Sequence, residues 1–199
     1  MTPTQLRDRA FALARTEPHA AAAIAGDIRD PWSRAQAFGA IVRYAAESDL
    51  GRFLAEARSA SGAAPDPYRR VGSAAWWLRA LVERGQQREV AREVPGVLAV
   101  VPTIANAVSR IDGLFLIFQA VFAMPESRRA VIDALIGAAG EANSWKAGYR
   151  LRDAALMLAR EHPDEAARVI DAMPDGKYKR QALRRIEARE HQTPRAFFW

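Results

Sequence analysis

The residues best suited to recognition chemistry in this sequence pair an aromatic side chain with an arginine near the start of predicted helices. The pairs two positions apart are Trp32 with Arg34, Tyr68 with Arg70, and Tyr178 with Arg180. Looser members of the group are Trp77, Arg110, and Trp145 with Arg150. Aromatic and arginine side chains are enriched at binding hot spots, and both also stack on nucleic-acid bases. These residues are therefore the candidate partner-binding edge.

A purely structural interpretation of the same residues stands beside this one. Each aromatic would pack between neighbouring helical hairpins, and each arginine would meet a carbonyl or a carboxylate next to it. The sequence favours this interpretation, because buried aromatics dominate core energetics. Trp76 and Trp77 lie 100° apart on a helix, so we expect them to be unequally buried.

The types and spacing of the other polar residues predict no catalysis. The chain has no cysteine, and no nucleotide-binding glycine loop, zinc-protease motif or nucleophile elbow is present. His19, His162 and His191 have no carboxylates at ligand or triad spacing. The carboxylate pairs at positions 89/93 and 171/175 are typical of solvated helix faces. We expect no enzyme activity, metal or cofactor.

The C-terminal end of the chain offers a basic helix and an aromatic tail. Lys177, Arg180, Arg184 and Arg185 gather on one side of the predicted helix 176–190. This side is either a docking face for an acidic protein, nucleic acid or an anionic membrane surface, or the polar outer face of a terminal capping helix, which the sequence favours. Residues 197–199 are three aromatics, and leaving them in water would invite aggregation. We expect this tail to fold back on the protein.

The charge balance supports that division of the chain. Residues 1–176 carry 22 basic and 21 acidic side chains, and residues 177–199 carry the remaining 7 and 2 of the 29 and 23 in total. The excess of +6 thus lies almost wholly at the C-terminal end, which argues against a generally basic nucleic-acid binder. The arginine- and alanine-rich composition is typical of a bacterial GC-rich genome.

Internal repetition organises the chain. LRDRAFALARTEP at residues 6–18 returns as LRDAALMLAREHP at residues 151–163, with eight identical positions, and VIDA recurs at 131–134 and 169–172. Such self-similarity indicates stacked repeats. We expect Asp8 and Asp153, in the two LRD copies, either to pair with their neighbouring arginines or to cap a turn.

The helical periodicity covers almost the whole sequence. Strong predicted starts are Thr2-Pro3, Asp30-Pro31 and Asp66-Pro67, since a polar cap followed by proline suits a helix N-terminus. Long helices alternate with short ones, about eleven in all, including one over residues 103–124. Pro95-Gly96 is expected to break or sharply kink its helix. We predict an all-α superhelix of about five hairpins, with residues 1–191 as one domain and 192–199 as a tail.

The segments RAFALARTEPHAAAAIAGDI and ALMLAREHPDEAARVIDAM resemble tetratricopeptide-like hairpins, and the spacing of 36–40 residues elsewhere is similar to HEAT-like repeats. The resemblance implies non-enzymatic binding of a protein partner along a groove or edge. The alternative is nucleic-acid binding of the HEAT-like type through the aromatic–arginine edge and the basic last helix.

The location of the protein is predicted from what its apolar segments lack. The N-terminus has no apolar run after a basic start, and the most apolar stretch, residues 113–124, is too short to span a bilayer. We therefore expect a cytoplasmic protein without a membrane span.

Overall fold

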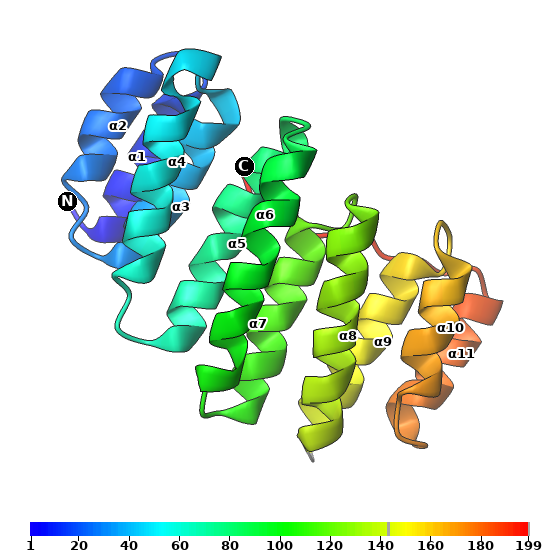
Figure 1. Ribbon diagram of the computed structural model, residues 1–199. Helices are drawn as coiled ribbons and strands as arrows, with labels where there is room; N and C mark the ends of the chain where they lie inside the picture. The colour runs from blue at the N-terminus through cyan, green and yellow to red at the C-terminus, as the bar shows by residue number, and fades with distance from the viewer. Residues whose placement is uncertain (143, 199) are drawn as a thin grey trace.

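The chain folds as a stack of helical hairpins (Figure 1). The computed structural model describes residues 1–142 and 144–198, and these form eleven α-helices and no strand. In chain order they are α1 (Pro3–Ala14), α2 (Pro18–Gly26), α3 (Pro31–Tyr44), α4 (Glu47–Gly62), α5 (Pro67–Glu83), α6 (Gln87–Val100), α7 (Ala107–Ala120), α8 (Pro125–Glu141), α9 (Trp145–Leu158), α10 (Pro163–Asp171) and α11 (Lys177–Glu187). A 3-10 turn, η1 (Val101–Thr103), joins α6 to α7. The predicted all-α class and helix number are confirmed.

The helices form two layers. The odd-numbered helices pack in series, α1 on α3, α3 on α5, α5 on α7, α7 on α9 and α9 on α11. Each even-numbered helix packs on the odd helices beside it, except that α6 packs on α5 and α8 and is separated from α7 by η1. The largest fully buried side chains come mainly from the odd layer, among them Ile41, Leu78, Phe118 and Leu151. This arrangement agrees with the hairpin array expected from the repeats.

The helix starts follow the caps read from the sequence. Thr2 and Gln5 form a reciprocal capping box, the Gln5 amide donating to Thr2 Oγ1 at 3.2 Å. Asp30 accepts from the Ser33 amide at 2.9 Å. Asp66 accepts from the Tyr68 amide at 2.8 Å. Capping satisfies amides that the first helical turn leaves unpaired.

The duplicated LRD segment gives a duplicated contact. Arg7 binds Asp8 and also donates to Gln36 Oε1 on α3 at 2.9 Å. Arg152 binds Asp153 and donates to Gln181 Oε1 on α11 at 3.0 Å. The predicted pairing of both aspartates with neighbouring arginines is confirmed. Each arginine also joins its odd helix to the next odd helix.

Three details differ from the sequence-based expectations. Helix α6 was expected to break or kink at Pro95 but continues through it. Proline leaves the carbonyl of Ala91 without its helical hydrogen bond. Ala91 is exposed on the outer layer, so this carbonyl can bond to water instead. Trp76 and Trp77 are both only 3% exposed, because α5 lies between neighbours on several sides. The helix expected over 103–124 is shorter, with Thr103 in η1 and Asn106 capping Ser109.

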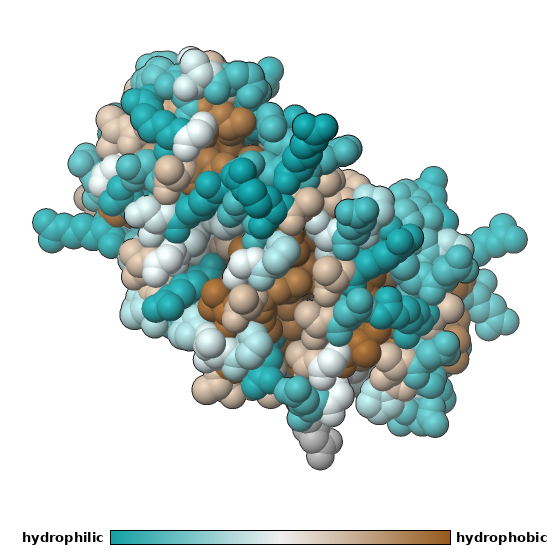
Figure 2. Space-filling view, in the orientation of Figure 1, coloured by the Kyte–Doolittle hydropathy of each residue, from teal (hydrophilic) through white to brown (hydrophobic). Residues whose placement is uncertain are grey.

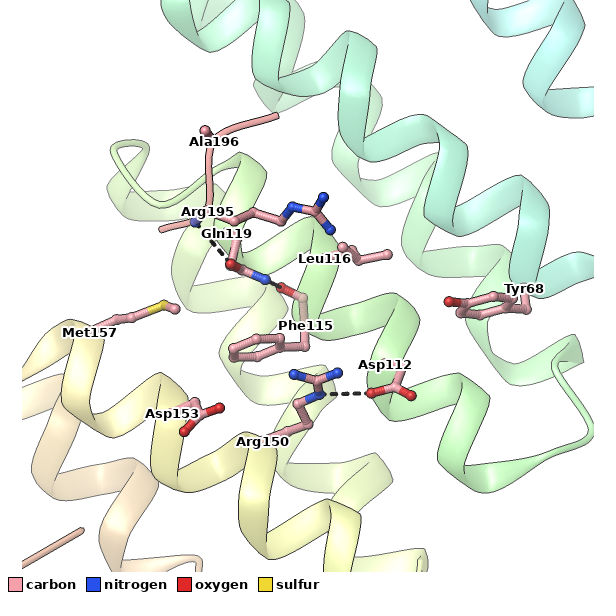
Figure 3. Close-up of a pocket in the computed structure, with 10 residues that line it drawn as sticks. All are labelled: Tyr68, Asp112, Phe115, Leu116, Gln119, Arg150, Asp153, Met157, Arg195 and Ala196. Atoms are coloured by element: carbon pink, nitrogen blue, oxygen red, sulfur yellow. Dashed lines mark hydrogen bonds and ion pairs between the residues drawn. The ribbon is translucent and has the colours of Figure 1, made fainter. Parts of the chain in front are cut away.

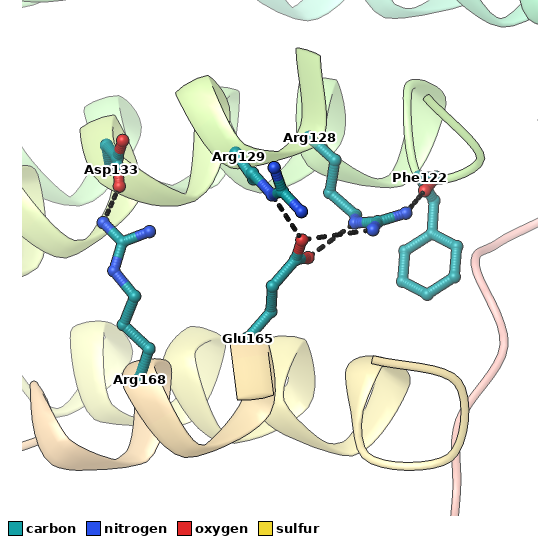
Figure 4. A network of polar contacts seen from close by, with 6 residues as sticks. All are labelled: Phe122, Arg128, Arg129, Asp133, Glu165 and Arg168. Carbon is teal, nitrogen blue, oxygen red and sulfur yellow. Dashed lines mark hydrogen bonds and ion pairs between the residues drawn. The ribbon is translucent and has the colours of Figure 1, made fainter. Parts of the chain in front are cut away.

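One buried arginine joins α8 to α10 in the outer layer (Figure 4). Arg128 is 3% exposed and donates to Glu165 at 2.7 Å and to the Phe122 carbonyl at 2.6 Å. Exposed Arg129 reaches the same carboxylate at 3.2 Å. Burial raises the pKa of Glu165, but the hydrogen bonds and charges of Arg128 and Arg129 outweigh it, so the pKa lies below the ordinary 4.5. The carboxylate thus neutralises an otherwise unpaired buried guanidinium.

Hydrophilic side chains cover much of the face seen in Figure 1, with apolar side chains showing in a recess near its centre (Figure 2). None of the helices in the described residues has both the length and the apolar character needed to cross a membrane.

Candidate functional site

Residues 192–198, here named the strap, leave the helical array and run across the odd-helix layer without regular secondary structure, with a bend at Phe197. The Gln192 amide donates to the Leu156 carbonyl on α9 at 3.3 Å. The Arg195 amide donates to Gln119 Oε1 on α7 at 3.0 Å. The Phe197 carbonyl accepts from Trp76 Nε1 on α5 at 3.2 Å. In Figure 1 the red segment accordingly passes behind α8 and ends beside α5.

The apolar end of the strap fills a slot between helices. Phe197 is 1% exposed, and its ring meets that of Trp76 edge to face at 5.2 Å between centroids. Half-buried Phe198 lies 6.0 Å from Phe11 on α1 and beneath the guanidinium of Arg43 on α3. The expected folding back of the aromatic tail is therefore observed for its first two residues. Trp199 lies outside the described residues.

Arg195 is the cationic element of the strap. Its guanidinium lies 5.5 Å from the ring centroids of both Trp76 and Phe197, within range of a cation–π attraction. The side chain is otherwise exposed, as is that of Ala196. Among the side chains of residues 192–198, only that of Phe197 is fully buried.

A cavity of about 600 Å³ opens beside the strap, between α5, α7 and α9 (Figure 3). Asp112 and Arg150 face each other across it at 2.7 Å, and Lys146 lies 3.5 Å from the same carboxylate. Asp153, 6% exposed, lines the cavity while bound to Arg152. The cavity has the size of a ligand pocket, and charges of both signs line it.

Tyr68 on α5 closes one side of this cavity. Burial, and secondly the charge of Asp112, raise the pKa of Tyr68 above the ordinary 10.0, while Arg150 opposes the shift. Its hydroxyl is thus a neutral hydrogen-bonding group at physiological pH. No nucleophile with an adjacent base lines the cavity, and among the described residues no three His, Asp or Glu side chains gather closely enough to hold a metal ion.

Every arginine side chain of the predicted aromatic–arginine edge except that of Arg180 has a partner among the described residues. Arg34 pairs with Glu56 at 2.7 Å. Arg70 donates to the Ala64 carbonyl at 2.6 Å. Arg110 donates to the Ile104 carbonyl and binds Glu141 at 2.5 Å. Arg70, Arg110 and Arg128 all reach a carbonyl six residues earlier, so they fasten the loop that precedes their helix.

The aromatics of that edge are divided between packed and displayed positions. Trp32 is half-buried and stacks on Tyr68 at 6.2 Å. Trp77 is buried and donates to Ser61 at 3.1 Å. Tyr178 packs against Gly148 on α9, whereas Trp145 is 63% exposed. The aromatics of this edge therefore differ in exposure, and Tyr68 and Arg150 line the same cavity beside the strap.

On α11, Arg185 pairs with Glu190 at 2.6 Å. Lys177, Arg180 and Arg184 are exposed, and no ion pair joins them to a described residue. These three remain candidates for contact with an anionic partner.

The sequence-based prediction missed the residues that hold the strap, namely Trp76, Gln119 and Arg195. The one available signal was Gln119, a lone polar residue in the apolar run 113–124. The pairing partners lie 76 and 121 residues away along the chain, so no local pattern could have indicated them. The chain matches no known family model, no curated protein and no solved structure.

Proposed function

We propose that this protein is a non-catalytic helical-repeat scaffold that binds a protein partner along the face of its odd-numbered helices. The observation that carries the proposal is the strap, an extended segment held by α5, α7 and α9. A face that holds an extended segment of its own chain has the geometry that peptide recognition requires. The cavity beside the strap adds charged and apolar groups that a partner's side chains can contact.

Site-specific photo-crosslinking in the source cells tests this proposal. A benzoylphenylalanine at Leu116, which lines the cavity, should form an adduct of discrete mass. The same probe at Arg92, on the outer helix α6 and 66% exposed, should not. The identified partner, once purified, should bind the full chain in calorimetry and lose that binding with Leu116→Arg but not with Arg92→Glu. No adduct at Leu116, or equal adducts at both positions, would contradict the proposal.

Nucleic-acid binding is a second candidate, favoured by exposed Lys177, Arg180 and Arg184 on α11. Three phosphate contacts predict an affinity that falls with salt at a logarithmic slope of about −2 to −3. The measurement is a titration of labelled DNA and RNA at several salt concentrations. Unchanged binding after Arg180→Glu with Arg184→Glu would end this candidate.

A further inference from the structure

The strap's hydrogen bonds with α5 and α7 come from two buried polar side chains, and both join the main chain of the strap. Gln119 is 5% exposed, and its amide nitrogen donates to Phe115 at 3.4 Å, which turns its oxygen towards the strap. Trp76 is 3% exposed and has one indole N–H to donate. Each group finds its partner in the strap backbone. Buried polar groups without partners are costly, so this surface requires a segment that supplies one N–H and one carbonyl.

The spacing of these two contacts selects an extended backbone. The N–H belongs to residue 195 and the carbonyl to residue 197. In an extended chain, residues two apart present their main-chain groups to one side and their side chains to one face. Accordingly Arg195 and Phe197 both lie against Trp76. A helical ligand would not supply this pair of groups, because its amides and carbonyls bond to one another.

We propose that the surface under the strap, formed by Trp76, Gln119 and the slot of Phe197 and here named the track, binds an extended segment of a partner protein. This segment carries Arg, a small residue and an aromatic in succession, and it displaces the strap from the track. The inference rests on the proposed function and names the chemistry of the partner. The arginine would lie over Trp76, and the aromatic would enter the slot of Phe197.

The strap is suited to displacement because one buried side chain, Phe197, and three main-chain hydrogen bonds hold it. It is nevertheless tethered, so its effective concentration at the track is on the order of millimolar. A free peptide with the same contacts therefore binds the intact chain weakly. Weakening the strap raises the fraction of molecules whose track is open, and the apparent affinity for the peptide rises in proportion.

The test uses fluorescence anisotropy of a labelled peptide with the sequence of residues 192–198, QTPRAFF. We expect it to bind full-length Phe197→Ala at least about tenfold more tightly than the wild-type chain, because the competing strap is released. Adding Gln119→Leu to that variant should abolish the gain, and a peptide with alanine in place of its first phenylalanine should not bind. Circular dichroism and thermal unfolding establish that each variant is folded.

If Phe197→Ala does not fold, Arg195→Ala replaces it, since Arg195 is exposed and its loss weakens the strap by removing the cation–π contact with Trp76. A folded variant that binds the peptide no better than wild type would overturn the proposal. So would a wild-type dimer in light scattering that Phe197→Ala converts to monomer, because the track would then belong to a second copy.

Failure here is distinguishable from failure of the proposed function. A crosslinked partner at Leu116 without peptide binding rejects this inference and leaves the scaffold function standing. Peptide binding without any crosslinked partner rejects the scaffold function and supports the track as a site for extended segments.

Discussion

At the scale of single residues, polar groups inside the odd-helix layer set the specificity of the contacts. Gln36 and Gln119 are similarly buried, at 3% and 5% exposed. Gln36 accepts from a side chain, that of Arg7, whereas Gln119 accepts from the main chain of the strap. The two glutamines therefore form a matched pair for separating fold stability from strap attachment.

Gln119→Leu should lower the free energy of unfolding by about 1 kcal/mol, because it removes one buried hydrogen bond. It should also speed hydrogen exchange of the Arg195 amide. Gln36→Leu is the control, with a similar loss in urea unfolding and no change at Arg195. Equal exchange rates at Arg195 in both variants would contradict the assignment of Gln119 to the strap.

At the scale of helices, glycine marks where two helices approach most closely. A Cβ at Gly39 on α3 would lie 3.0 Å from Trp76 Cβ and 3.1 Å from the Trp76 backbone on α5. A Cβ at Gly137 on α8 would meet nothing within 4 Å. Trp76 is held from the other side by the strap, so α5 has little freedom to retreat.

Gly39→Ala should destabilise the protein by about 1–3 kcal/mol through overpacking. Gly137→Ala should instead stabilise it by about 0.5–1 kcal/mol, because alanine favours the helix. Chemical denaturation of both variants measures the difference. A stabilising Gly39→Ala would show that α3 and α5 separate more easily than their contact indicates.

The contact of Arg128 on α8 with Glu165 on α10 predicts that the stability of the protein depends on pH. Because the pKa of Glu165 is lowered in the folded protein, the unfolded chain binds this proton more tightly. The stabilisation is therefore fully present above about pH 4.5 and is lost as the pH falls through the folded-state pKa.

Glu165→Gln should remove that acid-limb dependence and lower stability at pH 7 by about 2 kcal/mol, since the buried Arg128 loses a charged partner. Urea unfolding between pH 3 and pH 7 measures both effects. Asp133→Asn is the control, because Asp133 pairs with Arg168 on the same two helices but is 54% exposed. If stability still falls at low pH to the same extent in Glu165→Gln, the fall must come from other carboxylates.

The extent of sequence-based prediction also follows scale. The helix starts at Asp30-Pro31 and Asp66-Pro67 could be predicted because capping depends on neighbouring residues. The arginine–aspartate pairs of the two LRD segments could be predicted because the partners are adjacent in the sequence. The burial of both Trp76 and Trp77 could not be predicted, because helical periodicity identifies the apolar face of one helix and not how many other helices surround it. Arg34, Arg70, Arg110 and Arg150 contact loop carbonyls and carboxylates up to 38 residues away. Whether any residue of the aromatic–arginine edge binds a partner stays a prediction.

At the scale of the whole molecule, the strap is a contact between elements that do not otherwise meet. Stacked repeats are stabilised by their nearest neighbours, so distant helices open independently. The strap connects α9 with α5 and α1. It therefore couples the stability of the two ends.

Phe197→Ala should uncouple them. In wild type, the best-protected amides of α3 and α9 should exchange with similar free energies, and in the variant those of α3 should exchange faster than those of α9. Hydrogen exchange with mass spectrometry resolves the two helices. Trp145→Ala, which removes an exposed aromatic, should leave the pattern unchanged, and a uniform shift in Phe197→Ala would rule out coupling.

The length of the strap also limits how many helices can lie between its two ends. From Gln192 on α9 to Phe197 beside Trp76 on α5 it has five residue steps, which reach about 17 Å when extended. Packed helices lie about 8–10 Å apart, so the two spacings from α9 through α7 to α5 already use this reach, and one further hairpin between α5 and α9 would carry Trp76 beyond Phe197. Gain or loss of a repeat in this part of the chain must therefore be matched by a change in strap length.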